Sequence, residues 1–376
     1  MSSNDWEQRK LGELGSLKNG MNFSKEAMGI GFPFVNLQNI FGNNVIDVTN
    51  LGKAMASDSQ LKDYNLLNGD VLFVRSSVKL EGVGEAALVP QNLENTTYSG
   101  FIIRFRDEYG LDNNFKRFLF GIESVRNQIM AQATNSANKN ISQTVLENLC
   151  LKIPNKSEQE KIGLYFSDID HLITLHHRKC EETKKLKKFM LQKMFPKKGE
   201  KVPDIRFDGF TDDWEQRKFS DVVDIGNGMD YKHLEEGNIP VYGTGGYMLS
   251  VNKALSDDKD AIGIGRKGTI DKPYILRAPF WTVDTLFYCI PKENYDLDFT
   301  SCIFQNVDWK KKDESTGVPS LSKVIINNVE TATPTVEEQK KIGDYFRSLD
   351  HLITLHQQKC DELRNVKKFM LQNMFI

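Results

Sequence analysis

Two short basic segments carry the residue types that bind nucleic acid. Arg75-Ser76-Ser77-Val78-Lys79 follows an apolar run that ends at Val74, and Gly265-Arg266-Lys267-Gly268-Thr269 follows an apolar run that begins at Ala261. Small residues and backbone N–H groups let such a turn approach an anion, and arginine suits a phosphate or a guanine edge. Either segment alone is explained equally well as a charged turn, but two similarly placed segments favour a polyanion. The DNA contacts predicted from them are Arg75, Ser76, Ser77, Lys79, Arg266, Lys267 and Thr269.

Amide side chains offer hydrogen-bonding groups that can read the edges of adenine. They occur in Asn36-Leu37-Gln38-Asn39 and again in residues 135–140. Amide-rich loops are more commonly turns, so this signal is weaker than that of the basic segments. Asn36 and Gln38 are predicted as further DNA contacts.

Catalytic and cofactor-binding motifs are not found in the sequence. Residues 263–269 contain glycines five apart but lack the lysine that a phosphate-binding P-loop needs after Gly268. There is no Asn-Pro-Pro-aromatic run of the kind seen in adenine methyltransferases, and the acidic residues form no nuclease-like constellation. The sequence therefore predicts a chain without a catalytic centre or a cofactor of its own.

His176, Cys180, His356 and Cys360 place a His and a Cys four residues apart in two equivalent segments. If two helices cross near residues 178 and 358, the four side chains come together and can bind zinc tetrahedrally. If they cross near 176 and 356, the histidines face each other and the cysteines are separated by ~12 Å of helix axis. The sequence does not distinguish these registers. The favoured interpretation is a polar layer that sets the helix register, with no metal.

Lysines are concentrated between residues 184 and 201. A solvated helix face is the simplest interpretation of such a run, and phosphate contacts are the alternative. Over the whole chain, Lys+Arg 49 against Asp+Glu 51 gives a net charge of -2, which excludes a uniformly basic coat. The lysines are Lys184, Lys185, Lys187, Lys188, Lys193, Lys197, Lys198 and Lys201.

The 376 residues allow two or three globular domains, and the 39% hydrophobic and 27% charged content is typical of globular proteins. The start of the sequence lacks the basic and apolar regions of a secretory signal, and no apolar run is long enough to span a membrane. The five cysteines are far apart, which indicates reduced thiols rather than a disulfide framework. A cytoplasmic location is therefore expected.

Two parts of the sequence are repeated. Trp6-Glu7-Gln8-Arg9-Lys10 recurs at 214–218, and Asn19-Gly20-Met21 recurs at 227–229 in the same register. Residues 158–196 align without gaps on 338–376, and 25 of the 39 positions are identical. The sequence between the repeats has diverged almost completely, so two scaffold segments alternate with two segments free to specialise.

The 39-residue repeat has the pattern of a long helix with an apolar seam. Apolar positions three and four residues apart predict two helices of ~38 residues that pair as an antiparallel coiled coil with pseudo-twofold symmetry. Ser157 and Glu160 resemble a capping box, and Leu172, Leu175, Leu186 and Phe189 are expected to widen the seam. The pair can be a generic linker, but the close duplication favours a spacer that holds two modules at a set distance. The predicted interface residues are Ile162, Phe166, Ile169, Ile173, His176, Ile342, Phe346, Leu349, Ile353 and His356.

The fold class predicted is mixed α/β, with two globular modules separated by the two long helices. Short β-type runs separated by Gly, Asn and Asp occur in both modules, and helical stretches such as Asn114 to Ala133 follow them. The predicted boundaries are 1–156 for the first module and 157–202 for the first helix and its linker. The second module is placed at 203–335 and the second helix at 336–376.

This order of motifs resembles the specificity subunit (HsdS) of type I restriction-modification systems. The resemblance rests on Trp-Glu-Gln-Arg-Lys-Leu-Gly-Glu-Leu at 6–14, Pro-Phe-Val-Asn-Leu-Gln-Asn-Ile at 33–40 and Glu-Gln-x-Lys-Ile-Gly at 158–163 and 338–343. The helix ends with Lys-Lys-Phe-Met-Leu-Gln at 187–192 and 367–372 also match. The matching motifs cover the whole chain in the family's order.

The resemblance implies that each variable module is a target recognition domain for one half of a split, asymmetric DNA sequence. It also implies that the helices dock two methyltransferase subunits (HsdM) and that restriction subunits (HsdR) join to form the nuclease. S-adenosylmethionine would then belong to the modification subunits, and ATP and Mg²⁺ mainly to the restriction subunits. The alternatives are a standalone DNA methyltransferase or nuclease with a coiled-coil arm, which the missing motifs disfavour, and a purely structural scaffold.

Overall fold

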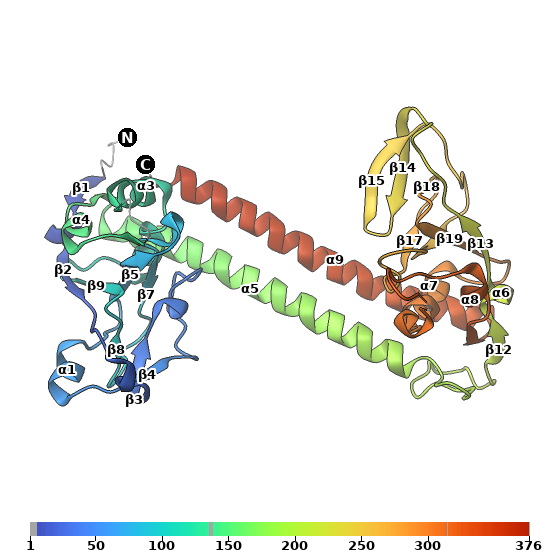
Figure 1. Cartoon of the computed structure of the whole chain (residues 1–376), viewed down its shortest axis with the longest axis horizontal. Helices are drawn as coiled ribbons and strands as arrows, with labels where there is room; N and C mark the ends of the chain where they lie inside the picture. Colours follow the sequence, from blue (N-terminus) through green and yellow to red (C-terminus); the bar gives the residue numbers. More distant parts are fainter. Residues whose placement is uncertain (1–5, 135–137, 314, 376) are drawn as a thin grey trace. The chain divides into compact units, whose positions relative to one another are not determined.

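Two compact units make up the chain in the computed structural model, which describes residues 6–134, 138–313 and 315–375 (Figure 1). The first unit comprises Met1–Leu175 and Lys359–Ile376, and the second comprises His176–Gln358. Each unit contains one variable module and parts of both long helices. The mixed α/β fold class predicted from the sequence is confirmed.

The first module is built on a four-stranded antiparallel sheet with the strand order β2-β9-β5-β7. Strand β5 is apolar and buried at all four positions, which explains its central place. A three-stranded sheet has the order β4-β3-β8, and two two-stranded sheets pair β1 with β11 and β6 with β10. The strands are β1 (Glu7–Lys10), β2 (Gly15–Asn19), β3 (Met28–Val35), β4 (Gly52–Ala54), β5 (Val71–Val74), β6 (Ser76–Ser77), β7 (Ala86–Leu88), β8 (Thr97–Tyr98), β9 (Ile102–Asp107), β10 (Lys139–Asn140) and β11 (Cys150–Ile153).

The second module repeats this topology although its sequence has diverged. Its four-stranded sheet has the order β13-β19-β16-β17, its three-stranded sheet has the order β15-β14-β18, and β12 pairs with β20. The strands are β12 (Glu215–Lys218), β13 (Val223–Asn227), β14 (Glu236–Gly243), β15 (Gly246–Val251), β16 (Ala261–Gly265), β17 (Tyr274–Leu276), β18 (Trp281–Thr282), β19 (Leu286–Pro291) and β20 (Glu330–Thr333). The two modules therefore share one scaffold.

Short helices cover the sheets in both modules. The α-helices are α1 (Asp58–Asp63), α2 (Asn113–Leu119), α3 (Glu123–Gln132), α4 (Gln143–Glu147), α6 (Phe219–Val222), α7 (Leu297–Asn306) and α8 (Lys323–Asn327). The 3-10 helices are η1 (Leu11–Glu13), η2 (Lys25–Ala27), η3 (Leu37–Asn39), η4 (Leu80–Gly82) and η5 (Trp309–Lys312). The helical stretch predicted over Asn114 to Ala133 is wrong in one respect, because a break at residues 120–122 divides it into α2 and α3.

The repeated segments form the long helices α5 (Lys156–Lys193) and α9 (Val336–Asn373), each of 38 residues. The predicted capping box is wrong, because Ser157 lies inside α5. The side chain of Asn155 instead accepts a hydrogen bond from the backbone N–H of Glu158 at 3.0 Å, which is the contact of an N-cap. In α9 the hydroxyl of Thr335 accepts from the backbone N–H of Glu338 at 3.4 Å.

The repeated Glu-Gln-x-Lys-Ile-Gly motif fastens each long helix to its own module. In the first unit Gln159 accepts a hydrogen bond from the backbone N–H of Asp112 at 3.0 Å, and Asp112 caps α2. A Cβ at Gly163 would lie 2.6 Å from the backbone nitrogen of Phe115, so only glycine allows the two helices to approach this closely. The motif is therefore a packing device.

The second unit repeats this attachment. Gln339 accepts from the backbone N–H of Asp296 at 3.1 Å, and Asp296 caps α7. A Cβ at Gly343 would lie 2.4 Å from the carboxylate of Asp296 and 3.0 Å from the backbone nitrogen of Phe299.

Segments of α5 and α9 contact each other within each unit, and they run antiparallel. In the first unit Lys367 donates to Asp170 at 2.6 Å, and the thiol of Cys360 lies 3.5 Å from the carbonyl oxygen of Ile173. The equivalent contacts in the second unit join Lys187 to Asp350 at 2.7 Å and Cys180 to the carbonyl oxygen of Ile353 at 3.8 Å. The two sets of contacts exchange the roles of α5 and α9, so equivalent residues of the repeat make equivalent contacts in the two units.

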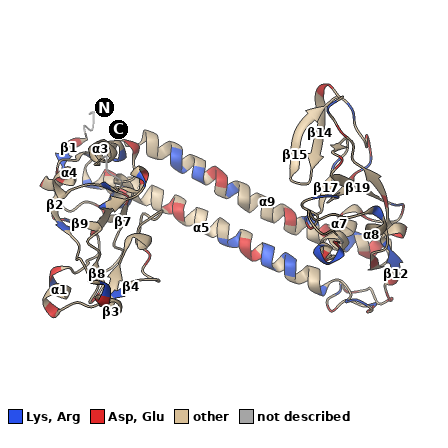
Figure 2. Cartoon of the chain, in the orientation of Figure 1, with Lys and Arg blue, Asp and Glu red and all other residues tan. Residues whose placement is uncertain are grey.

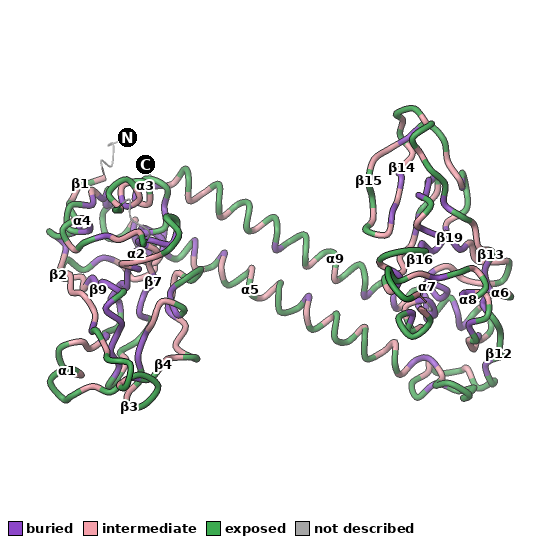
Figure 3. The backbone as a smooth tube through the Cα atoms, in the orientation of Figure 1, coloured by how far each residue is buried: buried purple, intermediate pink, exposed green. Residues whose placement is uncertain are grey.

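The predicted interface residues lie on the inner side of the long helices. Ile162 and Phe166 belong to the core of the first module, and Ile342, Phe346 and Leu349 belong to the core of the second. Ile169 is also buried, whereas Ile173, His176, Ile353 and His356 are half-buried. Burial follows one stripe of each helix, and the remaining surface is exposed (Figure 3).

The expectation that Leu172, Leu186 and Phe189 widen the seam is wrong, because all three are exposed. Leu175 is half-buried. Within the part of the chain that the structure describes, no helix combines the length and the apolar character needed to cross a membrane. The five cysteines are free thiols, and burial raises the pKa of Cys289 and Cys302.

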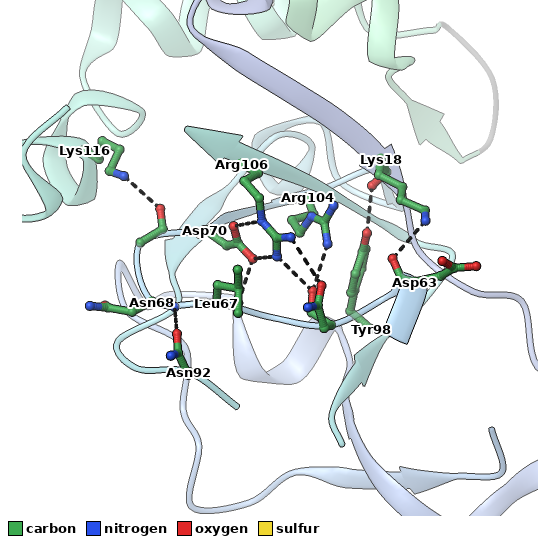
Figure 4. Close-up of polar contacts among 12 residues, drawn as sticks. Lys18, Asp63, Leu67, Asn68, Asp70, Asn92, Tyr98, Arg104, Arg106 and Lys116 are labelled. Atoms are coloured by element: carbon green, nitrogen blue, oxygen red, sulfur yellow. Dashed lines mark hydrogen bonds and ion pairs between the residues drawn. The ribbon is translucent and has the colours of Figure 1, made fainter. Parts of the chain in front are cut away.

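A polar network is buried beside the four-stranded sheet of the first module (Figure 4). Arg106 donates to both carboxylate oxygens of Asp70, at 2.8 and 2.6 Å, and these hydrogen bonds raise the pKa of Arg106. Arg104 and Arg106 also donate to the backbone oxygen of Asn65. Burial raises the pKa of Tyr98, whose hydroxyl donates to the backbone oxygen of Lys18. The sequence alone did not indicate this network.

Candidate nucleic-acid interface

Arg75 follows the last residue of β5 and is held by three hydrogen bonds. Its backbone N–H donates to Phe101 at 2.8 Å, and its backbone oxygen accepts from Ile141 at 3.0 Å. Its guanidinium Nη1 donates to the carbonyl oxygen of Gly100 at 3.3 Å. The side chain is half-buried, and its remaining donors are not engaged by any hydrogen bond found among the described residues.

Arg266 lies directly after β16 in the second module and has equivalent hydrogen bonds, although its side chain is exposed. Its backbone N–H donates to Thr285 at 2.7 Å, and its backbone oxygen accepts from Leu321 at 2.9 Å. Its Nη1 donates to the carbonyl oxygen of Asp284 at 3.4 Å, and its guanidinium carbon lies 5.9 Å from the centre of the Phe287 ring. The structure therefore places the two arginines, which come from unrelated local sequences, at equivalent positions.

The other predicted residues of the first basic segment lie on the same edge. Ser76 and Ser77 form β6, which pairs with β10, and Ser77 accepts a hydrogen bond from the backbone N–H of Lys79 at 3.2 Å. Both serines are half-buried, and Lys79 is exposed. Ser76, Ser77 and Lys79 line a cavity of about 550 Å³ together with Phe41.

The second basic segment lines a smaller cavity of about 400 Å³. Arg266 and Lys267 form part of its wall, and Lys323 from the start of α8 adds a third cation. Thr269 is half-buried and follows Gly268, whose φ of 89° is favourable for glycine alone. Lys323 was not among the predicted residues, because a lysine at a helix start carries no signal by itself.

Asn36 and Gln38 have different places in the first module. The side-chain oxygen of Asn36 accepts a hydrogen bond from the backbone N–H of Gln38 at 3.0 Å and caps η3. This oxygen therefore stabilises the start of the 3-10 helix. Gln38 is exposed and is available to a ligand. In the second amide-rich segment, residues 135–137 lie outside the described residues.

The lysine-rich segment is largely paired with acidic side chains. Lys193 and Lys197 both contact Asp204, and Lys187 donates to Asp350. Lys184 pairs with Glu181, and Lys201 pairs with Asp213. Acidic side chains occur among the basic ones along both long helices, except toward the end of α5, where basic side chains predominate (Figure 2). These contacts favour the solvated-face interpretation over phosphate binding.

The two histidines face each other in the second unit. Nδ1 of His176 lies 3.0 Å from Nδ1 of His356, and the ring centres are 5.3 Å apart. The structure therefore has the register in which the histidines meet, and each cysteine contacts a backbone carbonyl of the opposite helix. Among the described residues no group of three or more His, Cys, Asp or Glu side chains could hold a metal ion.

The sequence profile of the type I restriction modification DNA specificity domain matches residues 3–185 and 211–365. These two segments include most of both modules and of both long helices. The profile therefore matches twice, in agreement with the repeated topology.

Two curated relatives come from Methanocaldococcus jannaschii. The putative type I restriction enzyme MjaX specificity subunit is 25% identical over 402 residues, which cover 97% of this chain and 91% of the relative. The type I restriction enzyme MjaVIII specificity subunit is 24% identical over 282 residues, which cover 64% of each protein. Similarity thus extends over the full order of modules and helices.

Solved structures share the fold. The type I restriction-modification S subunit from M. genitalium has a TM-score of 0.68 at 18% identity, with 100% of this chain and 98% of that chain covered. HsdS from Thermoanaerobacter tengcongensis has a TM-score of 0.51 at 17% identity, with 100% and 97% covered.

These comparisons favour a recognition subunit over a standalone methyltransferase or nuclease. The profile, the relatives and the repeated modules agree with the resemblance seen in the sequence. The chain belongs to the family of type I restriction-modification DNA specificity subunits, the non-catalytic DNA-recognition components of these systems, and has two recognition domains.

Proposed function

We propose that this chain recognises a bipartite, asymmetric sequence in double-stranded DNA, with one half-site read by each domain. The equivalence of Arg75 and Arg266 carries the proposal. Each arginine has one guanidinium nitrogen held by a backbone carbonyl oxygen, Gly100 for Arg75 and Asp284 for Arg266, and this contact orients the guanidinium. An arginine held in this way can bind a guanine edge or a phosphate.

The neighbours of the two arginines differ, which supports two different half-sites. Phe101 accepts the backbone N–H of Arg75 and Val78 follows Arg75 by three residues, whereas the residues at the equivalent positions of the second module are Thr285 and Thr269. Because base readout depends on the side chains that reach the groove, a shared frame with different neighbours suits an asymmetric site.

The proposal is tested by assembling the chain with its methyltransferase partner and selecting the duplexes that this complex binds from a random-sequence pool. Two separated groups of specified bases are expected. A single uninterrupted group, or no sequence preference, would contradict it.

The long helices are proposed to dock two copies of one methyltransferase subunit (HsdM). Exposed apolar side chains repeat in the two units: Leu172, Val366 and Phe369 in the first correspond to Leu352, Leu186 and Phe189 in the second. Exposed apolar groups of this kind mark protein interaction surfaces. Their duplication supports two equivalent partners, and restriction subunits (HsdR) are proposed to join the resulting complex.

Substitution of one copy of this surface tests the docking proposal. Phe189→Asp and Phe369→Asp should each remove one methyltransferase subunit from the complex, and the double variant should remove both. Native mass spectrometry measures the stoichiometry. Val202→Asp, at a similarly exposed apolar residue of the linker, is the control and should retain both subunits. Unchanged stoichiometry in the double variant would place the docking surface elsewhere.

The cofactors are proposed to belong to the partner subunits. The sequence lacks a P-loop and an adenine-methyltransferase motif, which supports S-adenosylmethionine on the modification subunits and ATP and Mg²⁺ mainly on the restriction subunits. Equilibrium dialysis with labelled S-adenosylmethionine should show binding by the assembled complex and none by the purified chain.

A further inference from the structure

We propose that Val78 and Phe101 form an apolar wall that contacts the 5-methyl group of a thymine in the half-site read by the first domain. This inference rests on the proposed DNA-recognition function and adds a specificity-determining pair to it. Val78 is 77% exposed and Phe101 is 59% exposed, and both line the cavity of about 550 Å³ beside β6.

The position of Phe101 ties this wall to Arg75. The carbonyl oxygen of Phe101 accepts the backbone N–H of Arg75, and the carbonyl oxygen of the preceding residue, Gly100, accepts the Arg75 guanidinium. Arg75 binds the backbone that carries Phe101, whereas the cavity itself is lined by Ser76, Val78 and Phe101, so we expect the thymine to adjoin the base that Arg75 contacts. Leu37 and Phe41 continue the apolar lining of the cavity.

The charges around the cavity favour a base edge over a phosphate. Lys79 is exposed at its rim, but Glu81 and Glu85 also line it, and the carboxylate of Glu85 accepts the backbone N–H of Gly42 at 2.9 Å. Two carboxylates repel a phosphate group, whereas an apolar wall between polar groups fits the major-groove edge of an A·T pair. In that groove the thymine methyl is the apolar group that distinguishes bases.

The second domain provides a comparison within the same chain. Thr285 takes the place of Phe101, because it accepts the backbone N–H of Arg266 as Phe101 accepts that of Arg75. Thr269 takes the place of Val78, because each follows its arginine by three residues. Exposed apolar side chains near that segment are Val318, which is adjacent to Pro319, the acceptor for the backbone N–H of Gly268, and Val324 at the start of α8. The Val78–Phe101 wall is therefore a feature of the first domain.

The test uses the assembled complex and synthetic duplexes of its recognised sequence, in which each thymine is replaced in turn by deoxyuridine. This replacement removes one methyl group and leaves base pairing intact. At one or more positions of one half-site, the wild-type complex should bind the deoxyuridine duplex roughly fourfold more weakly, the equivalent of ~0.8 kcal/mol for one buried methyl group. The double variant Val78→Thr/Phe101→Thr, which copies the second domain, should lose that sensitivity and retain the sensitivities of the other half-site.

Identical deoxyuridine profiles for the wild-type and double-variant complexes would overturn the inference, as would a wild-type profile with no sensitive position. Recognised half-sites without any A·T pair would also overturn it. Sequence-selective binding of the unmodified duplex is measured first. Its absence would contradict the proposed function itself, so the two failures are distinguishable. A single variant, Phe101→Leu, keeps an apolar contact and should retain most of the thymine preference.

Discussion

Arg75 and Arg266 occupy the same position in the two recognition domains, each directly after an inner strand of a four-stranded sheet. In both, the backbone N–H, the backbone oxygen and one guanidinium nitrogen have equivalent partners. The surrounding sequences share almost no identity, so the similarity is one of structure. Two arginines with equivalent hydrogen bonds in duplicated domains are the basis for expecting two DNA contacts.

Arg75→Ala and Arg266→Ala should each weaken DNA binding by the assembled complex. If the arginine reads a base, the loss should be on the order of 1–3 kcal/mol and confined to one position of one half-site. If it contacts a phosphate, binding should weaken for all sequences and the salt dependence should become shallower. Fluorescence anisotropy at several salt concentrations separates these outcomes.

Arg178→Ala is the matched control, because Arg178 is an exposed arginine of α5 that pairs with Glu182 four residues later. It should bind DNA as the wild type does. Unchanged DNA binding in both Arg75→Ala and Arg266→Ala would show that the two basic segments are ordinary charged turns.

Gly163→Ala and Gly343→Ala should destabilise the units to which these glycines belong. Each added Cβ would lie less than 3 Å from atoms of the helix cap that it packs against. The overlap should cost up to about 3 kcal/mol, which exceeds the gain of ~1 kcal/mol that alanine brings to a helix interior. Differential scanning calorimetry should show a lower transition temperature for each variant.

Gly121→Ala is the control for this pair, since its Cβ would meet no atom closer than 3.5 Å. A transition temperature at or above the wild-type value for Gly163→Ala would show that α5 and α2 tolerate a wider separation.

Asp70 and Arg106 form a pair that the second domain replaces with apolar residues. Ala261 and Ile290 stand at the equivalent strand positions and pack in an apolar cluster with Leu276 and Phe280. Asp70 is 2% exposed, so Asp70→Ala leaves the Arg106 charge without its carboxylate and should cost on the order of 3 kcal/mol. The double variant Asp70→Ala/Arg106→Ile should recover most of this loss in chemical denaturation.

If the double variant is as unstable as Asp70→Ala, the polar network is an irreplaceable part of the first domain. Such a result would show that the hydrogen bonds from Arg106 to Asn65, which the double variant also removes, stabilise the domain.

The contact between His176 and His356 should couple the two long helices within the second unit. His176→Leu and His356→Leu each remove the ring-to-ring hydrogen bond, whereas the double variant replaces both rings with apolar groups. A double-mutant cycle of unfolding free energies should give a coupling of about 0.5–1.5 kcal/mol. Strictly additive single-variant effects would show that the histidines do not act as a pair.

Elemental analysis of chelator-free protein complements this cycle. Less than stoichiometric zinc, with no loss of stability on chelation, is expected for a pair that sets the helix register. One equivalent of zinc per chain would contradict that role.

The long helices are predictable from the sequence because their pattern is local and repeated. The predicted length of ~38 residues agrees with α5 and α9, each of which has 38 residues. The exact start was predicted wrongly because Asn155 and Ser157 are both good caps, and only the position of the preceding strand decides between them. The exposure of Phe189 was missed because heptad spacing alone cannot show how wide the buried stripe is.

The shared topology of the modules could not be predicted, because it depends on pairings between residues far apart in the sequence. Strand β5 pairs with β9, some 30 residues later. The equivalent strands β16 and β19 of the second module pair in the same way although almost all of their side chains differ. The equivalence of Arg75 and Arg266 was indicated by their place after an apolar run. The exposed pair Val78 and Phe101 gave no such signal. Apolar residues are normally expected in the core, and two of them 23 positions apart cannot be paired from the sequence without the strand arrangement.

Mapping of methylated adenines in DNA exposed to the assembled complex tests the central claim most directly. The claim predicts one bipartite, asymmetric motif whose two specified halves are separated by unspecified bases. It also predicts that Val78→Thr/Phe101→Thr alters the motif in one half alone. A continuous motif, a symmetric one, or methylation that does not depend on this chain would contradict the assignment of one half-site to each domain.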